Sequence, residues 1–334
     1  MSASTESGGA RPLRERVGSN DIARVVEILV ERVREQVGEG QVLCALSGGV
    51  DSAVTAALVQ KAVGDQLTCV FVNHGLMRLD EPAQVEEVFR NQFGMDLIHL
   101  DYEDRYLGLL KDVTDPEEKR KIIGGEFWKI FFEEAEKLDG VKYLAQGTIY
   151  PDIIETGVEG TEHVKSHHNV VPFPPGVRFD LVEPLKYLYK DEVRQLGLEL
   201  GLPEHIVWRQ PFPGPGLGVR VIGLLTKEKL DILREADAIV REEISAWDTE
   251  RTVWQYFCIL ADIQCTGTED GKRTYARPVI IRAINSTNAM TAEVAELPYE
   301  LLLKMSTRII AEVEGINRVS YDISPKPPAT IEWE

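Results

Sequence analysis

Apolar residues in the first half of the chain alternate between two patterns, which together predict an α/β fold. Residues 20–37 carry apolar side chains at helical spacing, which is typical of an amphipathic helix. Short apolar runs that predict strands follow at 42–46, 67–72, 96–100 and 143–146. Helical patterns separate these runs, at 53–63, 81–93 and 117–138. Such alternation indicates βαβ units, a parallel sheet and right-handed crossovers.

The second half begins with a predicted helix at 187–201, which Gly201 and Pro203 terminate. The next segment, 211–218, is too rich in Pro and Gly for a helix or a central strand, and we place a domain boundary there. The chain is thus predicted to comprise a disordered tail at 1–19, a first domain at 20–210 and a smaller α/β domain at 211–334. The smaller domain has predicted helices at 227–246 and 297–314 and predicted strands at 253–260, 277–284 and 318–323.

One predicted strand–helix junction has the sequence Ser-Gly-Gly-Val-Asp-Ser, at residues 47–52. The N-terminus of a helix attracts anions, and glycines let a phosphate approach the backbone closely. The serines add hydroxyl donors, and Asp51 offers an oxygen ligand for Mg²⁺. Because neither Gly-Lys-Ser/Thr nor G-x-G-x-x-G is present, the turn is neither a Walker A loop nor a dinucleotide loop. An ordinary glycine turn is the alternative, but the serines and the aspartate favour phosphate binding.

Composition excludes several functional classes. A net charge of −18 argues against a nucleic-acid partner, so a nucleotide substrate would need local basic residues. No apolar stretch is long enough to span a membrane, and residues 1–17 lack the apolar core of a signal peptide. The four cysteines form no C-x-x-C pair, which predicts reduced, buried thiols in a cytoplasmic protein.

Three loops that follow predicted strands are expected to face one crevice, because ligands bind beyond the carboxyl ends of parallel strands. These loops begin at Ser47, Asn73 and Gly147. Lys186 precedes a predicted helix and is a candidate catalytic cation that would neutralise phosphate charge; an ordinary exposed lysine is the alternative.

Three further segments carry groups that could bind a ligand. The basic run 119–121 is either a solvated helix surface or an anion clamp. The Lys-Ser-His-His-Asn run at 165–169 has no partner at zinc spacing, so donors for a ligand or for domain contacts are favoured over a metal site. The proline-stiffened end, 324–334, is either a docked terminal segment or a rigid strap that presents Lys326 and Glu332 to a ligand.

The turn at 47–52 resembles the PP-loop of the N-type ATP pyrophosphatases, which include NAD synthetase and asparagine synthetase. Further motifs, running in order from about residue 40 to the end, resemble the GMP synthetase family. These motifs are residues 118–124, 146–148, 165–169, 212–220 and 326–334. The last two are the most specific.

The resemblance implies a parallel-sheet, adenine nucleotide α-hydrolase-like domain followed by a smaller α/β dimerisation domain. It implies ATP and Mg²⁺ as cofactors, and a reaction in which ATP adenylylates xanthosine 5′-monophosphate (XMP) and ammonia then displaces AMP to give GMP. The residues expected to hold ATP are Ser47, Gly48, Gly49, Val50, Asp51, Ser52, Ala53, Val72 and Gly147. Those expected to contact XMP are Arg120, Gln255, Asp270, Lys326 and Glu332. Asp51 is the expected metal ligand and, with Lys186, the expected catalytic pair.

Most relatives in this family carry a fused N-terminal glutaminase, and the resemblance leads us to expect none in this chain. Ammonia is therefore expected to come from solution or from a separate glutaminase subunit. A homodimer through the second domain is also implied. The sequence departs from the family pattern at Asn73, at 170–172 and at 265–270. The alternatives are another PP-loop ligase, such as an NAD synthetase or a tRNA thiolase, and a non-catalytic nucleotide-binding regulatory subunit.

Overall fold

The computed structural model describes residues 13–156, 178–287 and 289–334. They fall into two compact units that interleave along the chain. Unit 1 comprises Met1–Phe71, Val85–His99 and Phe131–Arg209, and unit 2 comprises Val72–Gln84, Leu100–Ile130 and Gln210–Glu334. The last segment of unit 2 begins next to the boundary predicted from the Pro- and Gly-rich run. Its two earlier segments begin in the last residues of β2 (Leu67–Asn73) and β3 (Asp96–Asp101), and the sequence did not predict this interleaving.

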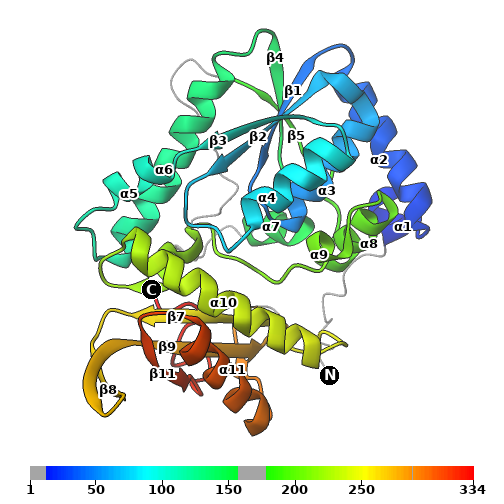
Figure 1. Cartoon of the computed structure of the whole chain (residues 1–334). Coiled ribbons are helices and arrows are strands. Elements are labelled where there is room, and N and C mark those ends of the chain that lie inside the picture. The colour runs from blue at the N-terminus through cyan, green and yellow to red at the C-terminus, as the bar shows by residue number, and fades with distance from the viewer. Residues whose placement is uncertain (1–12, 157–177, 288) are drawn as a thin grey trace, which may run out of the picture. The chain divides into compact units, whose positions relative to one another are not determined.

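The sheet built from the first half of the chain confirms the predicted parallel α/β architecture (Figure 1). β1 runs parallel to both β2 and β4, and β4 runs parallel to β5. In spatial order its strands are β3 (Asp96–Asp101), β2 (Leu67–Asn73), β1 (Gln41–Leu46), β4 (Val141–Ala145) and β5 (Asp180–Val182). β1 is the central strand and is almost entirely buried, which explains its unbroken apolar run.

Three helices of unit 1 pack on one another, namely α2 (Ile22–Val37), α3 (Val50–Val63) and α8 (Lys190–Glu199). α3 is apolar on nearly every side, and its Val54 and Leu58 are fully buried. A helix with this composition is stable only when it is enclosed. Its burial fixes the position of its first turn, which follows the Ser47 loop.

The remaining helical segments before unit 2's mixed sheet include α6 (Pro116–Ala135), which was predicted at 117–138, and several short helices that were not predicted. They are α1 (Leu13–Val17), α4 (Glu81–Val85), a π-helix (Glu86–Gln92), α5 (Glu103–Leu109), α6 (Pro116–Ala135), α7 (Tyr150–Thr156), α9 (Glu204–Val207) and 3₁₀ turns at Gly64–Gln66 and Gly216–Val219. Two differences from prediction stand out. The predicted helix at 81–93 changes to π geometry after Val85, and α1 forms within the stretch predicted to be a disordered tail.

Unit 2 contains a mixed sheet in the order β10-β9-β7-β6, with β8 and β11 also paired to β9. β9 runs antiparallel to β7, β8 and β10 and parallel to β11. The strands are β6 (Val221–Ile222), β7 (Gln255–Ala261), β8 (Cys265–Glu269), β9 (Lys272–Asn285), β10 (Glu293–Val294) and β11 (Ile316–Tyr321). The polar strand β8 was not predicted, because its Thr-Gly-Thr sequence lacks an apolar face.

Two helices pack with this sheet in Figure 1: α10 (Lys227–Trp247) against β7, and α11 (Tyr299–Glu312) against β11. Phe257, Ile259 and Ile280 form a buried cluster in the sheet, and Ile331 packs against it. The terminal segment is therefore docked on unit 2, as its apolar residues suggested. No helix in the described ranges has the length and apolar character that crossing a bilayer requires.

Candidate functional site

The Ser47 loop forms a preorganised turn between β1 and α3. Gly48 has a φ of 76°, in the left-handed region that glycine adopts without strain. The Ser47 and Ser52 hydroxyls lie 3.1 Å apart, and Ser52 also donates to the Gly49 carbonyl at 3.0 Å. The first intrahelical bond runs from the Ala53 amide to the Gly49 carbonyl, at 3.1 Å. The amides of residues 50–52 precede it and have no intrahelical acceptor, so this turn offers the donors that an anion needs.

Asp51 lies in the first turn of α3, and its two carboxylate oxygens have different surroundings. Oδ2 accepts a hydrogen bond from the Lys190 ammonium at 2.6 Å. Oδ1 is buried and has no hydrogen-bond partner among the described residues. The β4–α7 loop passes close by: a Cβ on Gly147 would lie 2.9 Å from the backbone carbon of Asp51. Glycine is therefore needed at 147, where the loop packs against the backbone and Cβ of Asp51.

This carboxylate fits Mg²⁺ as a partial ligand. Within the described part of the chain, no group of three or more His, Cys, Asp or Glu side chains is arranged to hold a metal. Mg²⁺ is commonly held by one or two carboxylates together with substrate phosphates and water, rather than by a protein cage. The unpartnered Oδ1 of Asp51 suits that type of binding.

Two cations beside the loop were missed by the sequence reasoning. Lys190, the first residue of α8, reaches Asp51, whereas the Lys186 ammonium lies over the Tyr187 ring, 5.3 Å from its centroid. Arg209 donates to the Gly48 carbonyl. Lys190 follows β5, and residues that follow the strands of a parallel sheet are candidates for ligand binding. The sequence did not predict β5, which is only three residues long, and Lys190 was therefore overlooked.

The other expected nucleotide residues occupy plain structural positions. Val50 and Ala53 are buried in the first turn of α3, and Val72 is buried near the end of β2. Asn73, one of the departures from the family pattern, accepts from the Gly75 amide at 3.0 Å and lies 3.4 Å from Asp101. Residues 165–169 and 170–172 lie outside the described residues.

In unit 2, the structure brings together two of the expected XMP contacts, Gln255 and Glu332. Arg220 is fully buried and donates to both Glu332 oxygens, at 3.0 and 2.9 Å. The Gln255 amide nitrogen lies 3.5 Å from Glu332 and 3.1 Å from the Pro211 carbonyl oxygen. The Glu332 carboxylate is therefore held in one orientation by groups of the same unit.

Arg120 and the end of the chain also meet. Arg120 donates to the Glu334 carbonyl oxygen, and the neighbouring Lys119, fully buried, pairs with the Glu334 carboxylate. The Lys119 ammonium donates to the Val221 carbonyl as well, at 2.9 Å, and Glu334 accepts from the Gly223 amide at 2.9 Å. These contacts fix the terminal residue against the start of α6.

The last two expected XMP contacts are held differently. The Lys326 ammonium donates to the Ala289 carbonyl at 2.8 Å. Asp270 lies in the turn between β8 and β9 with a φ of 49°. Asp270 is thus placed by a tight hairpin and Lys326 by a backbone acceptor.

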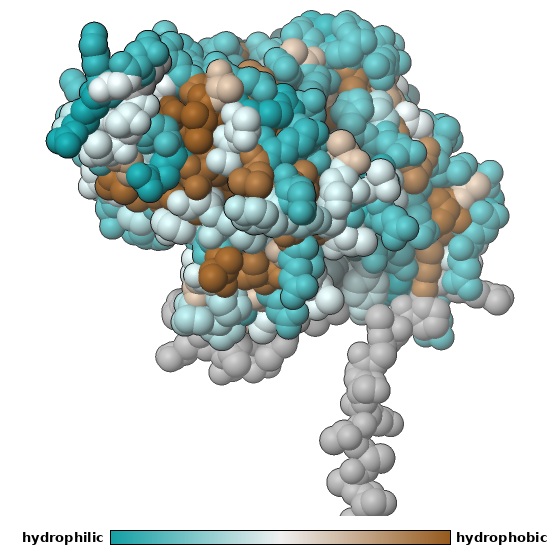
Figure 2. Space-filling view, turned by 60° about the horizontal axis from the view of Figure 1, so that its bottom comes forward, coloured by the Kyte–Doolittle hydropathy of each residue, from teal (hydrophilic) through white to brown (hydrophobic). Residues whose placement is uncertain are grey.

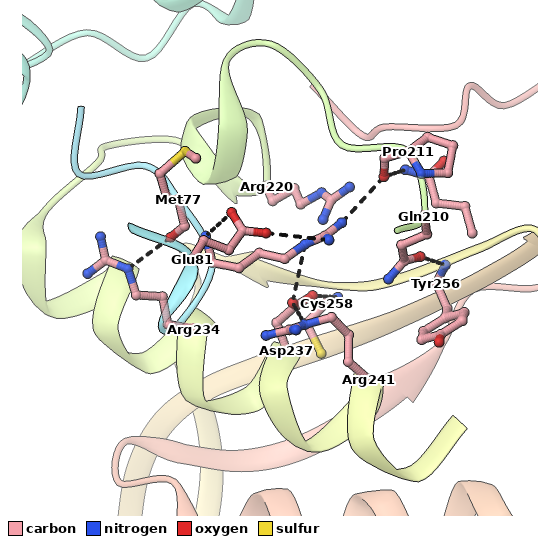
Figure 3. Close-up of polar contacts among 12 residues, drawn as sticks. Met77, Glu81, Gln210, Pro211, Arg220, Arg234, Asp237, Arg241, Tyr256 and Cys258 are labelled. Atoms are coloured by element: carbon pink, nitrogen blue, oxygen red, sulfur yellow. Dashed lines mark hydrogen bonds and ion pairs between the residues drawn. The ribbon is translucent and has the colours of Figure 1, made fainter. Parts of the chain in front are cut away.

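A buried polar network surrounds Arg78 in unit 2, and Figure 3 shows its partners. The Arg78 guanidinium lies 3.6 Å from Glu81 and 3.9 Å from Asp237, donates to the Pro211 carbonyl at 3.3 Å, and stacks over Phe212 at 4.3 Å. Burial lowers the pKa of Arg78 to about 9. This network anchors the start of the 211–218 segment.

Two family models match the chain, and they define its class. Residues 21–125 match the NAD synthase family, and residues 242–333 match the family described as GMP synthase C terminal domain. The first matched segment is thus similar to an NAD synthase domain, within an α/β architecture, and the second is similar to a GMP synthase C-terminal domain. Both similarities are those that the motifs predicted.

Individual relatives are similar to nearly the whole of this chain. The chain is 54% identical over 317 residues to a glutamine-hydrolyzing GMP synthase of Clostridium tetani, a match that covers 95% of this chain and 62% of the relative. It is 58% identical over 309 residues to the enzyme so named in Alkaliphilus metalliredigens, covering 92% and 61%. It thus spans about 62% of the length of the curated relatives it matches.

The solved structures that match part of the chain include an NMN synthetase from Francisella tularensis, at 16% identity and a TM-score of 0.46, covering 70% of this chain and 94% of that one. An NH3-dependent NAD synthetase from Campylobacter jejuni matches at 14% identity and a TM-score of 0.43, covering 70% and 85%.

Proposed function

We propose that this chain is a ligase that makes GMP. The C2 oxygen of XMP attacks the α-phosphorus of ATP, pyrophosphate leaves, and ammonia then displaces AMP from C2. The observation that carries the proposal is the pairing of a PP-loop with a GMP synthase C-terminal domain in one chain. The 54% identity to a named GMP synthase extends over 95% of the chain and supports both halves together.

The residues of the PP-loop suit the first step. The amides of the first turn of α3 and the hydroxyls of Ser47 and Ser52 would bind the phosphates that leave, and preorganised donors of this kind stabilise developing charge. Bound Mg²⁺, held by Asp51 with phosphate oxygens, would neutralise charge on the pyrophosphate. Lys190 adds a cation beside the PP-loop. We propose that Lys190, rather than Lys186, is the catalytic cation that neutralises phosphate charge.

The expected XMP contacts remain our proposal for the acceptor site. Arg120 offers a guanidinium suited to phosphate, and Lys326 offers an ammonium. Glu332 and Gln255 offer an oriented carboxylate and amide that suit hydrogen bonds to a purine. Asp270 completes the set that the motifs imply.

We further propose that the protein acts in the cytoplasm as a homodimer through unit 2, with ammonia from solution or from a glutaminase subunit. Supporting the dimer, large apolar side chains are exposed on unit 2, including Tyr275, Tyr299 and Ile323, at 61%, 69% and 75% exposure. Figure 2 shows apolar patches on the face it presents, separated by polar atoms.

Pyrophosphate release tests the proposal. The chain is incubated with ATP, Mg²⁺ and ammonium chloride, with either XMP or deamido-NAD as acceptor. Release that depends on XMP, with GMP and AMP formed in equal amounts, is the expected result. Release with deamido-NAD alone would instead establish the NAD synthase-like alternative, which the match over residues 21–125 raises. XMP binding without turnover would indicate a regulatory subunit. Replacing ammonium by glutamine shows whether the chain needs a glutaminase partner.

A further inference from the structure

Arg16, in the short helix α1, is held in unit 1 by an unusually complete set of contacts. Its guanidinium forms a fork with the Glu192 carboxylate, with nitrogen–oxygen distances of 3.0 and 2.5 Å. It also donates to the Tyr187 carbonyl oxygen. The Arg16 side chain is only 5% exposed, although it stands before the first long helix of the chain. A buried arginine is retained at low cost only when its donors are matched in this way.

Two aromatic rings complete the contacts of the Arg16 guanidinium, and we call the whole set of contacts the Arg16 clamp. The Arg16 guanidinium carbon lies 4.8 Å from the centroid of the Tyr189 ring and 5.5 Å from that of Tyr150. The two rings contact each other edge to face, with centroids 5.2 Å apart. Cation–π contacts gain strength in such a desolvated place. Arg16 therefore joins α1 to the start of α7 as well as to α8.

The contact between Arg16 and Glu192 is connected to the PP-loop through the first turn of α8. Glu192 is the third residue of α8, and its carboxylate accepts from the amide of Tyr189, the residue that caps the helix, at 2.7 Å. Lys190, the residue after Tyr189, begins α8 and donates to Asp51 at 2.6 Å. The loop before α8 is fixed to α7 as well, because the Tyr150 amide donates to the Leu188 carbonyl at 2.9 Å.

We propose that Arg16 is a positioning residue for Lys190: by clamping Glu192 it holds the first turn of α8, and so aims the Lys190 ammonium at the PP-loop. The catalytic part of this inference rests on the proposed function. A lysine side chain has many rotamers, so its aim depends on a rigid backbone. The first turn of a helix is also the part most prone to fray, and the capping Glu192 is the group that Arg16 holds.

A double-mutant cycle separates positioning from general stabilisation. Arg16→Met should lower kcat for XMP-dependent pyrophosphate release about 10-fold and leave the KM for XMP within about two-fold of wild type. Lys190→Met should lower kcat about 100-fold, leaving a measurable rate. If Arg16 acts through Lys190, the double variant should be no slower than Lys190→Met. If the fall in kcat of the double variant equals the product of the two single falls, the proposal is wrong.

Two further variants calibrate the result. Arg16→Lys keeps the charge and much of the stem but loses the fork, so it should restore part of the rate. Arg24→Met is the matched control, because Arg24 also lies near the N-terminus of unit 1 yet pairs with Glu27 on the surface, where both are more than half exposed. It should leave kcat unchanged.

Hydrogen–deuterium exchange tests, independently of activity, whether Arg16 holds the first turn of α8. In Arg16→Met, amides at the start of α8 should exchange at least about 10-fold faster than in wild type, whereas amides in β1 should not change. Unchanged exchange at the start of α8 would overturn the clamp. If the wild-type protein shows clear protection there but releases no pyrophosphate with XMP, the failure lies with the proposed function and not with the clamp.

Discussion

The PP-loop of unit 1 and the docked terminal segment of unit 2 use the same residue types for opposite purposes. At the PP-loop, Asp51 and Lys190 form one pair that is 28% and 40% exposed, and one Asp51 oxygen has no hydrogen-bond partner among the described residues. On the terminal segment, Glu332 pairs with Arg220, whose side chain is 0% exposed. An accessible, incompletely satisfied pair can exchange partners with a ligand. A buried pair held by two hydrogen bonds, as Arg220 holds Glu332, maintains structure, because separating it would leave a buried charge without its partner.

Arg282 is the clearest example in unit 2 of a buried charge that maintains structure. Its guanidinium is buried and pairs with Asp322 at 2.5 Å. It also donates to the carbonyl oxygens of Ser324, Thr330 and Ile331, at 3.1, 2.7 and 2.9 Å. One β9 side chain thus organises both ends of the segment that carries Lys326 and Glu332. We expect the loss of a buried charge such as that of Arg282 to act on stability, and charge changes at the PP-loop to act on turnover.

The largest effect should come from Arg282→Met. Removing the cation leaves the Asp322 carboxylate without its counter-ion and three carbonyls without the Arg282 donors, so the free energy of unfolding should fall by about 3–5 kcal/mol. Urea denaturation followed by circular dichroism measures it. The exposed pair variant Arg24→Met is the control and should change stability by less than about 0.5 kcal/mol. A loss below about 1 kcal/mol for Arg282→Met would remove the distinction between the two regions.

His74 makes the stability of unit 2 depend on pH. Burial, with a smaller contribution from Arg234, lowers the pKa of His74 to about 4. The unfolded chain takes up this proton near pH 6.5 and the folded chain only near pH 4, so stability is full above pH 6.5 and falls as the pH drops toward 4. The loss should reach about 3 kcal/mol.

Unfolding curves of wild type and His74→Gln, taken between pH 8 and pH 4, test this dependence. Their difference at pH 8 gives the effect of the substitution itself. Below pH 6.5 the wild type should lose stability more steeply than the variant. Parallel profiles over the whole range would contradict the assignment of the slope to His74.

Asp51→Asn should damage turnover while sparing the fold. The amide keeps the size of the side chain but weakens both the contact with Lys190 and the ligand for Mg²⁺. We expect kcat for XMP-dependent pyrophosphate release to fall about 100-fold, or about 2.7 kcal/mol. The melting temperature should stay within about 2 °C of wild type, since the pair is partly exposed. Near-normal turnover would refute the role of Asp51.

The smallest effect should come from Lys326→Ala, which probes the acceptor side. Lys326 contributes one hydrogen bond, to Ala289, so its loss should cost little stability. We expect the KM for XMP to rise about 10-fold and kcat to change little, the pattern of a lost binding contact. An unchanged KM would show that the terminal segment is structural only.

The sequence predicted those parts of the site that lie close together along the chain. The run from β1 through the Ser47 loop to α3 was predicted because apolar runs flank a glycine turn, and Asp51 is local to that turn. Lys190 was missed because its relation to Asp51 depends on the packing of α8 against α3. Arg220, which directly precedes β6, and Arg282, within β9, were missed because their partners lie far along the chain and only the fold brings them together.

The labelled C2 oxygen of XMP provides the most direct test of the proposed reaction. XMP that carries ¹⁸O at C2 is converted with ATP, Mg²⁺ and ammonium, and the products are analysed by mass spectrometry. If XMP attacks the α-phosphorus, the label leaves with AMP, one ¹⁸O for each GMP formed, and the pyrophosphate is unlabelled. Label in pyrophosphate or in inorganic phosphate, or GMP formed without labelled AMP, would contradict adenylylation at the PP-loop.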